Sequence, residues 1–133
     1  MVFALRALGA SRIGFASPYV APLNDRAIGF LAYEGFETVA RAEMAEPLSN
    51  TGQGALDPDT VFGLGCKADH PDAQVIVLSC TDMRSVEVIS RLETTLGKPV
   101  ITSNQAMVFQ TLFQLNISDF RPGFGQVFER LSK

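Results

Sequence analysis

Cys80 is the residue whose type and position most favour chemistry. It follows the apolar run 74–79 and precedes residues 81–84, where a helical pattern begins and where Asp82 is expected to cap the helix. A thiol is therefore predicted at the carboxyl end of a buried strand, the edge at which open α/β sheets bind ligands. A helix N-terminus at the same place would favour the reactive thiolate. Free cysteines are also often buried in cores, so a structural role for Cys80 stays open.

Polar side chains are also expected where the other strands end. They are Tyr19 after the first strand, Asn50 in the loop after the second, and Asn104 after the fourth. Together with a thiol and the N–H groups of helix starts, these neutral donors suit a small carboxylate, because the thiol can move a proton or attack carbon. The alternative for each of the three residues is a turn or cap role, which tyrosine and asparagine at loop positions also fill.

The elements that must position these residues alternate between strand and helix patterns. We expect strands at 12–17, 37–42, 74–79 and 99–102, and helices at 23–35, 84–96, 104–115 and from Asp57–Pro58 onward. Residues 45–56 are rich in Pro, Gly, Ser and Asn and predict a loop. This alternation implies right-handed crossovers and an α/β fold, with a four-stranded, mostly parallel sheet and helices on both faces.

Composition excludes several classes of function. The 133 residues are enough for a single domain, and 47% hydrophobic with 19% charged residues is a globular composition. The net charge of -3 argues against nucleic acid as a partner. No apolar stretch is long enough to cross a membrane, and the start lacks a signal-peptide pattern, so we expect a cytoplasmic protein. No phosphate-binding loop, dinucleotide fingerprint or metal-spaced His/Cys cluster occurs, so we expect neither a cofactor nor a metal.

Several segments together resemble the aspartate/glutamate racemase superfamily, and within it the maleate cis-trans isomerase and arylmalonate decarboxylase branch. They are VLSCTDMR at 77–84, LGKPVITSNQA at 96–106, SPY at 17–19, Asn50 with Gly54 and Pro58, and PGFG at 122–125. The match runs over nearly the whole chain. The resemblance implies a cofactor-free enzyme of two similar α/β halves with the active site between them, of which this chain resembles only the second half.

The resemblance also implies roles for individual residues. Cys80 would be the catalytic thiol of the second half, Tyr19 and Asn50 would bind a substrate carboxylate, and the backbone N–H of Thr81 would assist. Residues 1–103 would form the second-half domain. Residues 104–133 would form a C-terminal helix and tail that pack on the first half.

Three reactions and one non-enzymatic role stay open. Cys80 fits racemisation, isomerisation and decarboxylation of a small carboxylate, and without a first half the chain is expected to be inactive alone. The alternative is a truncated, non-catalytic module that dimerises or binds a partner. In either case we expect association through the helix 104–115, whose apolar residues would lack a partner inside the chain: Val108, Phe109, Leu112 and Phe113.

Overall fold

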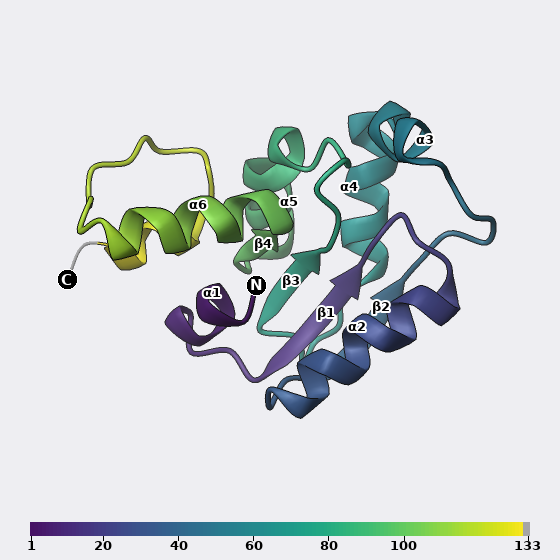
Figure 1. The fold of residues 1–133 in the computed structure, drawn as a ribbon, viewed down its shortest axis with the longest axis horizontal. Coiled ribbons are helices and arrows are strands. Elements are labelled where there is room, and N and C mark those ends of the chain that lie inside the picture. The colour runs from purple at the N-terminus through teal and green to yellow at the C-terminus, as the bar shows by residue number, and fades with distance from the viewer. Residues whose placement is uncertain (132–133) are drawn as a thin grey trace.

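Four strands pair in one parallel sheet in the order β2–β1–β3–β4 (Figure 1). They are β1 (Arg12–Ala16), β2 (Glu37–Ala42), β3 (Val75–Leu78) and β4 (Val100–Thr102). The structure is a computed structural model and describes residues 1–131. The predicted four-stranded α/β fold is confirmed. The sheet was expected to be mostly parallel, and all of its strand pairings are parallel.

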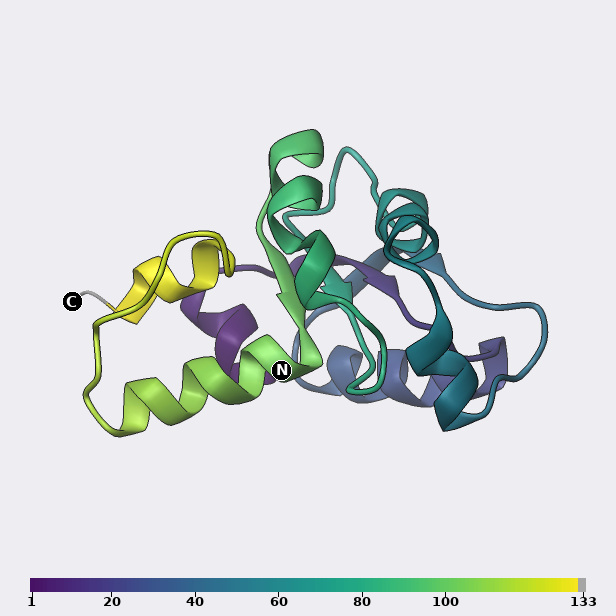
Figure 2. The ribbon, with the colours of Figure 1, turned by 90° about the horizontal axis from the view of Figure 1, so that it is seen from above.

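Helices cover both faces of this sheet. One face carries α1 (Val2–Ala7), α2 (Ala21–Tyr33), α6 (Ser103–Gln114) and the 3₁₀ helix η2 (Gln126–Leu131). The other carries α4 (Pro58–Lys67), the 3₁₀ helix η1 (Val86–Val88) and α5 (Ile89–Leu96). Seen from above, α6, α1 and η2 form a group at one end of the sheet, and α2, α3 (Asn50–Ala55) and α4 lie at the other (Figure 2).

Strand β3 shows why the sheet needs a cover on each side. Val75 and Val77 belong to the core under α1, α2 and α6, while Ile76 and Leu78 belong to the core under α4 and α5. All four side chains are at most 1% exposed. Since each buried branched side chain contributes about 1.5–3 kcal/mol, this strand anchors both layers, and it ends two residues before Cys80.

Close approach of α4 to the sheet depends on Gly14. A Cβ atom at this position in β1 would collide with the carbonyl oxygen of Ala68, just beyond the end of α4. Glycine therefore lets the helix pack directly on the strand that leads to Tyr19. At its other end, α4 begins as the sequence predicts, because Asp57 accepts a hydrogen bond from the Thr60 N–H and Pro58 occupies the first turn.

The predicted helix start beside Cys80 is wrong. Residues 81–83 bend, residues 84–85 have no regular structure, and helical structure begins only with η1 at Val86, so Asp82 caps no helix. The side chain of Met83 is 2% exposed and its carbonyl accepts a 2.7 Å hydrogen bond from the Ser85 N–H. Burial of Met83 holds the backbone in a tight turn, and the argument for a thiolate-favouring helix N-terminus at Cys80 is lost with the helix.

The predicted loop at 45–56 is also wrong in part, because it contains the short helix α3. Ser49 caps α3 by accepting a 3.1 Å hydrogen bond from the Gly52 N–H. Two glycines in six residues hide this helix from a propensity argument. The cap and the contacts of Gln53, described below, explain why it forms.

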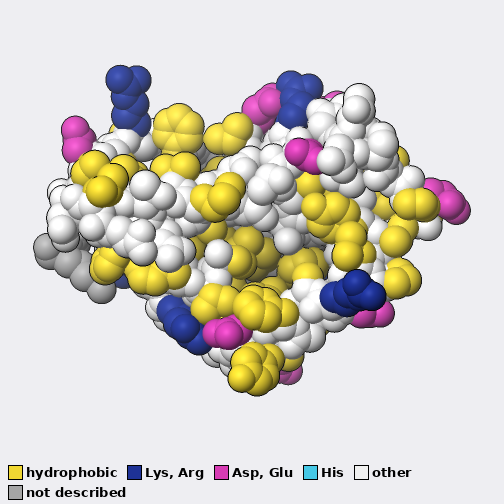
Figure 3. All heavy atoms as spheres, viewed as in Figure 1, with side chains coloured by type: hydrophobic (Ala, Val, Ile, Leu, Met, Phe, Trp, Pro, Cys, Tyr) yellow, Lys and Arg dark blue, Asp and Glu magenta, His cyan; other side chains and the backbone are white. Residues whose placement is uncertain are grey.

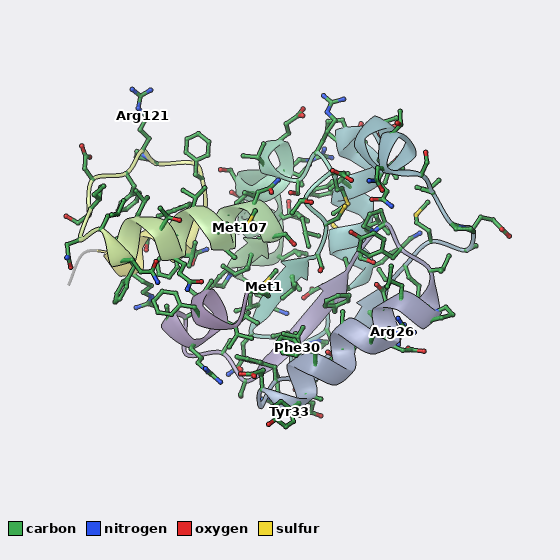
Figure 4. The ribbon with its side chains drawn as sticks, viewed as in Figure 1. Met1, Arg26, Phe30, Tyr33, Met107 and Arg121 are labelled. Atoms are coloured by element: carbon green, nitrogen blue, oxygen red, sulfur yellow. The ribbon has the colours of Figure 1, made fainter. Side chains whose placement is uncertain are left out.

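The helix α6 has a partner inside the chain for part of its apolar surface. Phe109 is fully buried, with ring centroids 5.6 Å from Phe3 and 6.2 Å from Phe128, so the expectation that it lacks an internal partner is wrong. Met107 and Val108 are 55% and 51% exposed. Met107 lies at the surface of α6, and hydrophobic side chains gather on this face of the molecule (Figures 3 and 4). The expected division into residues 1–103 and 104–133 stays a prediction. Residues 132–133 of the second segment lie outside the described residues.

Within residues 1–131, no helix is both long and apolar enough to cross a membrane.

Candidate functional site

The sheet order places a topological switch point between β1 and β3. The chain runs from β1 outward to β2 on one side, then returns to β3 and β4 on the other. In open α/β sheets, ligands bind outside the carboxyl ends of the strands at such a point. Tyr19 follows β1 and Cys80 follows β3, so these two predicted residues lie at the edge where the fold itself favours a ligand.

Cys80 is held by a side chain from α3. Its Sγ donates a 3.4 Å hydrogen bond to Oε1 of Gln53, and the two residues are 3% and 6% exposed. The second group of the same carboxamide, Nε2, donates a 3.1 Å hydrogen bond to the Leu48 carbonyl. The loop 43–49 and α3 therefore fold over the end of β3 and cover the thiol.

Tyr19 packs beside the same thiol. It belongs to the hydrophobic cluster that contains Cys80, and its pKa is raised to about 12 by burial first, then by hydrogen bonding and charge interaction with Cys80 and by the charge of Asp82. The phenol is therefore neutral throughout the physiological pH range. A neutral hydroxyl next to a thiol can donate a hydrogen bond to an anion without being repelled by it.

A buried polar network fixes the loop that carries Tyr19. The Ser17 hydroxyl accepts a 3.1 Å hydrogen bond from the Tyr19 N–H and donates a 2.6 Å hydrogen bond to Oδ1 of Asn24. Nδ2 of Asn24 in turn donates to Glu43, 3.1 Å away, and Arg41 pairs with Glu43. Since Ser17 and Asn24 are both fully buried, the loop after β1 is tied to the end of β2.

Asn50 lies at the first position of α3 and is exposed. It stands one helical turn before Gln53, so the two side chains share a side of the short helix. Gln53 is the α3 residue that contacts Cys80. The structure thus brings the helix of Asn50 to the site, and the role of Asn50 itself stays a prediction.

A contact between Asn104 and Thr81 joins the segments that follow β4 and β3. Nδ2 of Asn104, at the start of α6, donates a 3.0 Å hydrogen bond to the Thr81 carbonyl. This contact holds the turn after Cys80 against α6 and occupies one donor of the Asn104 amide. The proposed assistance of the Thr81 N–H stays a prediction, because the contact concerns the carbonyl of that residue.

Gln53 is the contact of Cys80 that the sequence analysis missed. Its neighbours Gly52 and Gly54 favour a loop in a sequence-based prediction. Because α3 was not predicted, nothing in the sequence indicated that the Gln53 carboxamide contacts the thiol. Cys66, the other cysteine, suits a packing role. It lies half-buried on α4, and burial raises the pKa of its thiol, an effect that nearby Arg91 opposes.

The arrangement can hold a small anion and move a proton beside it. A thiol, a neutral phenol and the carboxamide-bearing helices α3 and α6 meet at one edge of the sheet, and Arg41 and Glu43 of the network form an ion pair with each other. Thiols take part in both general acid–base and covalent catalysis.

The chain matches a known protein family and several of its members over most of its length. The arylmalonate decarboxylase family profile matches residues 1–128. Maleate isomerase from Pseudomonas putida is 31% identical over 126 residues, which cover 94% of this chain and 50% of that protein. Arylmalonate decarboxylase from Bordetella bronchiseptica is 31% identical over 131 residues, which cover 94% of this chain and 53% of that protein.

A solved structure agrees with these matches. A cysteine-to-serine variant of the Nocardia farcinica maleate cis-trans isomerase, with a covalently bound succinylcysteine intermediate, superposes with a TM-score of 0.90 at 26% identity. The match covers 96% of this chain and 52% of that one. The chain thus spans about half the length of the curated relatives it matches, and in sequence and fold it belongs to the arylmalonate decarboxylase family of the Asp/Glu racemase superfamily.

Proposed function

We propose that this chain is the catalytic second half of a cofactor-independent isomerase, racemase or decarboxylase that acts on a small mono- or dicarboxylate, and that its chemistry is closest to that of a maleate isomerase. Cys80 serves as the thiol acid or base. Tyr19, Asn50 and the N–H of Thr81 bind the substrate carboxylate.

The observation that carries this proposal is the position of Cys80 beside Tyr19 at the switch point of the sheet. The buried thiol has a hydrogen-bond partner of its own, and the phenol next to it stays neutral up to a pKa of about 12. A neutral donor beside a proton-transfer group is what a carboxylate substrate requires, since a charged base in the same place would repel it. The family membership supports the same reading, and the Nocardia relative carries a succinyl group on a cysteine.

A second candidate is a non-catalytic module that dimerises or binds a partner. Exposed apolar side chains on and after α6 favour it: Met107 is 55%, Val108 51% and Leu115 62% exposed. Such side chains are uncommon on one helix of a monomer unless another surface covers them. Under this reading the thiol site would be retained without turnover.

Complementation separates the two candidates. The 133-residue chain is mixed or co-expressed with the amino-terminal half of the Pseudomonas putida maleate isomerase and assayed with maleate, aspartate and arylmalonate. The proposal expects turnover of at least one substrate by the mixture and none by either half alone. A stable complex of the two halves that lacks turnover with every substrate would favour the non-catalytic module.

A further inference from the structure

Gln53 makes a side-chain hydrogen bond to Cys80. The distance from Sγ to Oε1 is 3.4 Å, and the contact bridges 27 positions of the chain. Both side chains are almost completely buried, at 3% and 6% exposure, so water does not compete freely for either atom. A buried polar contact of this kind restricts the orientations of both partners.

The orientation of the carboxamide is fixed by its other end. Nε2 lies 3.1 Å from the Leu48 carbonyl, which can only accept a hydrogen bond. If the amide were turned over, two oxygens would face each other there. The oxygen of Gln53 therefore points at the sulfur, and since this oxygen is an acceptor, it is satisfied by an S–H group and not by a bare thiolate.

We propose that Gln53 is a positioning residue for Cys80, whose carboxamide oxygen accepts the S–H hydrogen bond and keeps the proton on sulfur until substrate binds. The inference rests on the proposed role of Cys80 as the catalytic thiol and makes it more specific: the resting site is loaded with a proton donor. On transfer, the S–H bond breaks with its electron pair left on sulfur, and the electron pair of an enolate carbon of the substrate forms the new C–H bond to the proton. Gln53 has no proton to return through Oε1, so the thiolate takes its next proton from water.

Two titratable groups near the thiol also bear on it. The titratable groups that interact at this end of the sheet are Tyr19, after β1, and Asp82, in the turn after Cys80. Tyr19 stays neutral and hydrogen-bonds with Cys80, and Asp82 is exposed. Both are left unchanged in the variants below, so their influence is the same in every measurement.

The experiment uses the full chain with Cys66→Ser, which leaves Cys80 as its sole thiol. Gln53→Met preserves side-chain length and removes the oxygen, and Gln53→Glu preserves shape and adds negative charge next to sulfur. Gln114→Met, at the exposed end of α6, is the matched control. The readouts are the pH dependence of iodoacetamide alkylation and the S–H stretching band in the infrared, with melting curves to show that each variant is folded.

Opposite shifts are expected from the two substitutions at Gln53. Gln53→Met should move the S–H band to higher frequency and speed alkylation at neutral pH by roughly 3- to 10-fold, the effect of losing one hydrogen bond to the thiol. Gln53→Glu should slow alkylation, because a carboxylate disfavours the thiolate, and Gln114→Met should change neither readout. If both Gln53 variants shift alkylation in the same direction, Gln53 only packs and the proposal is wrong.

One measurement needs no variant at Gln53. In the Cys66→Ser chain itself, the S–H band should lie at the frequency of a hydrogen-bonded thiol. This frequency is lower than that of a free alkyl thiol dissolved in an apolar solvent, which serves as the reference. A free-thiol frequency would overturn the contact. None of these readouts requires turnover, so they can succeed where the complementation assay fails, or fail where it succeeds.

Discussion

Ser17 donates a 2.6 Å hydrogen bond to Asn24 in a fully buried pair that lies behind the loop of Tyr19. The same hydroxyl accepts from the Tyr19 N–H, and Asn24 passes the connection on to Glu43. The position of the phenol beside Cys80 therefore depends on side chains that never reach the site.

Asn24→Leu should destabilise the protein because it leaves the buried Ser17 hydroxyl without an acceptor. We expect the free energy of unfolding to fall by about 1–3 kcal/mol, measured by urea denaturation. Asn24→Asp is the matched variant, since it keeps an acceptor for Ser17 but sets a carboxylate against Glu43. The like charges raise the pKa of the new carboxyl, so its destabilisation should be smallest at low pH and grow as the pH rises to neutrality. Equal loss at all pH values would contradict the network.

The Tyr19 phenol should titrate near pH 12. The chain has two tyrosines, so Tyr33→Phe leaves Tyr19 as the single source of tyrosinate absorbance. The fold raises this pKa from 10.0 to about 12, so the neutral phenol is favoured in the folded state. The stability it contributes is complete below pH 10 and is lost as the pH rises through 12.

Adding Cys80→Ala to that chain should lower the Tyr19 pKa only in part. Burial is the largest cause of the shift and remains, while the interactions with Cys80 are removed. A titration unchanged by Cys80→Ala would mean that the two side chains are not coupled.

The strands and the edge of the site were predictable from the sequence, for a physical reason. Residues 74–79 are apolar without alternation, which is typical of a strand buried on both faces, and β3 occupies 75–78 with both faces covered. Once the strands are known, parallel connections must bring Tyr19 and Cys80 to the same edge.

What the sequence could not predict depends on tertiary contacts. The bend at 81–83 forms because Met83 enters the core, and a periodicity argument cannot distinguish it from the first turn of a helix. The helix α3 depends on the cap by Ser49 and on the contacts of Gln53, which outweigh its two glycines. Phe109 packs against Phe3 and Phe128, which lie more than 18 positions away in either direction. Its burial therefore cannot be predicted from the neighbouring sequence.

Cys80→Ala should abolish the turnover of an assembled two-half enzyme, while Cys66→Ala leaves it near normal. Loss of a proton-transfer group typically lowers the rate by roughly 10²- to 10⁴-fold. Cys66 lies half-buried on α4 and its pKa is raised by burial, which suits packing. The measurement is kcat in the complementation mixture. Similar losses from both variants would remove the case for Cys80 as the catalytic thiol.

Asn50→Ala should raise KM and leave the melting temperature nearly unchanged. The cap of α3 comes from Ser49, so the fold does not need the Asn50 side chain, whereas a substrate carboxylate would lose a hydrogen bond to a charged group. We expect roughly a 10- to 100-fold increase in KM. Ser49→Ala is the control that weakens the cap itself. A large fall in the melting temperature of Asn50→Ala, with KM unchanged, would identify Asn50 as a structural residue.

Phe109 and Met107 should respond in opposite ways, although both are apolar residues of α6. Phe109 is fully buried, so Phe109→Ser should reduce the free energy of unfolding by about 3–5 kcal/mol, as for other large-to-small core substitutions. Because the destabilised core exposes apolar surface, Phe109→Ser should also lower solubility. Met107 on α6 and Leu115 just after its end are 55% and 62% exposed. Met107→Lys with Leu115→Lys should therefore change stability by less than about 0.5 kcal/mol.

The same pair of lysines tests whether α6 is an association surface. Because exposed apolar side chains on one face favour contact with another surface, we expect the unmodified chain to sediment as a concentration-dependent oligomer and the double-lysine variant to sediment as a monomer. Arg26→Glu on α2, an exposed change of charge outside α6, is the control for a general effect of charge. A monodisperse monomer for the unmodified chain, at every concentration tested, would show that α6 needs no cover.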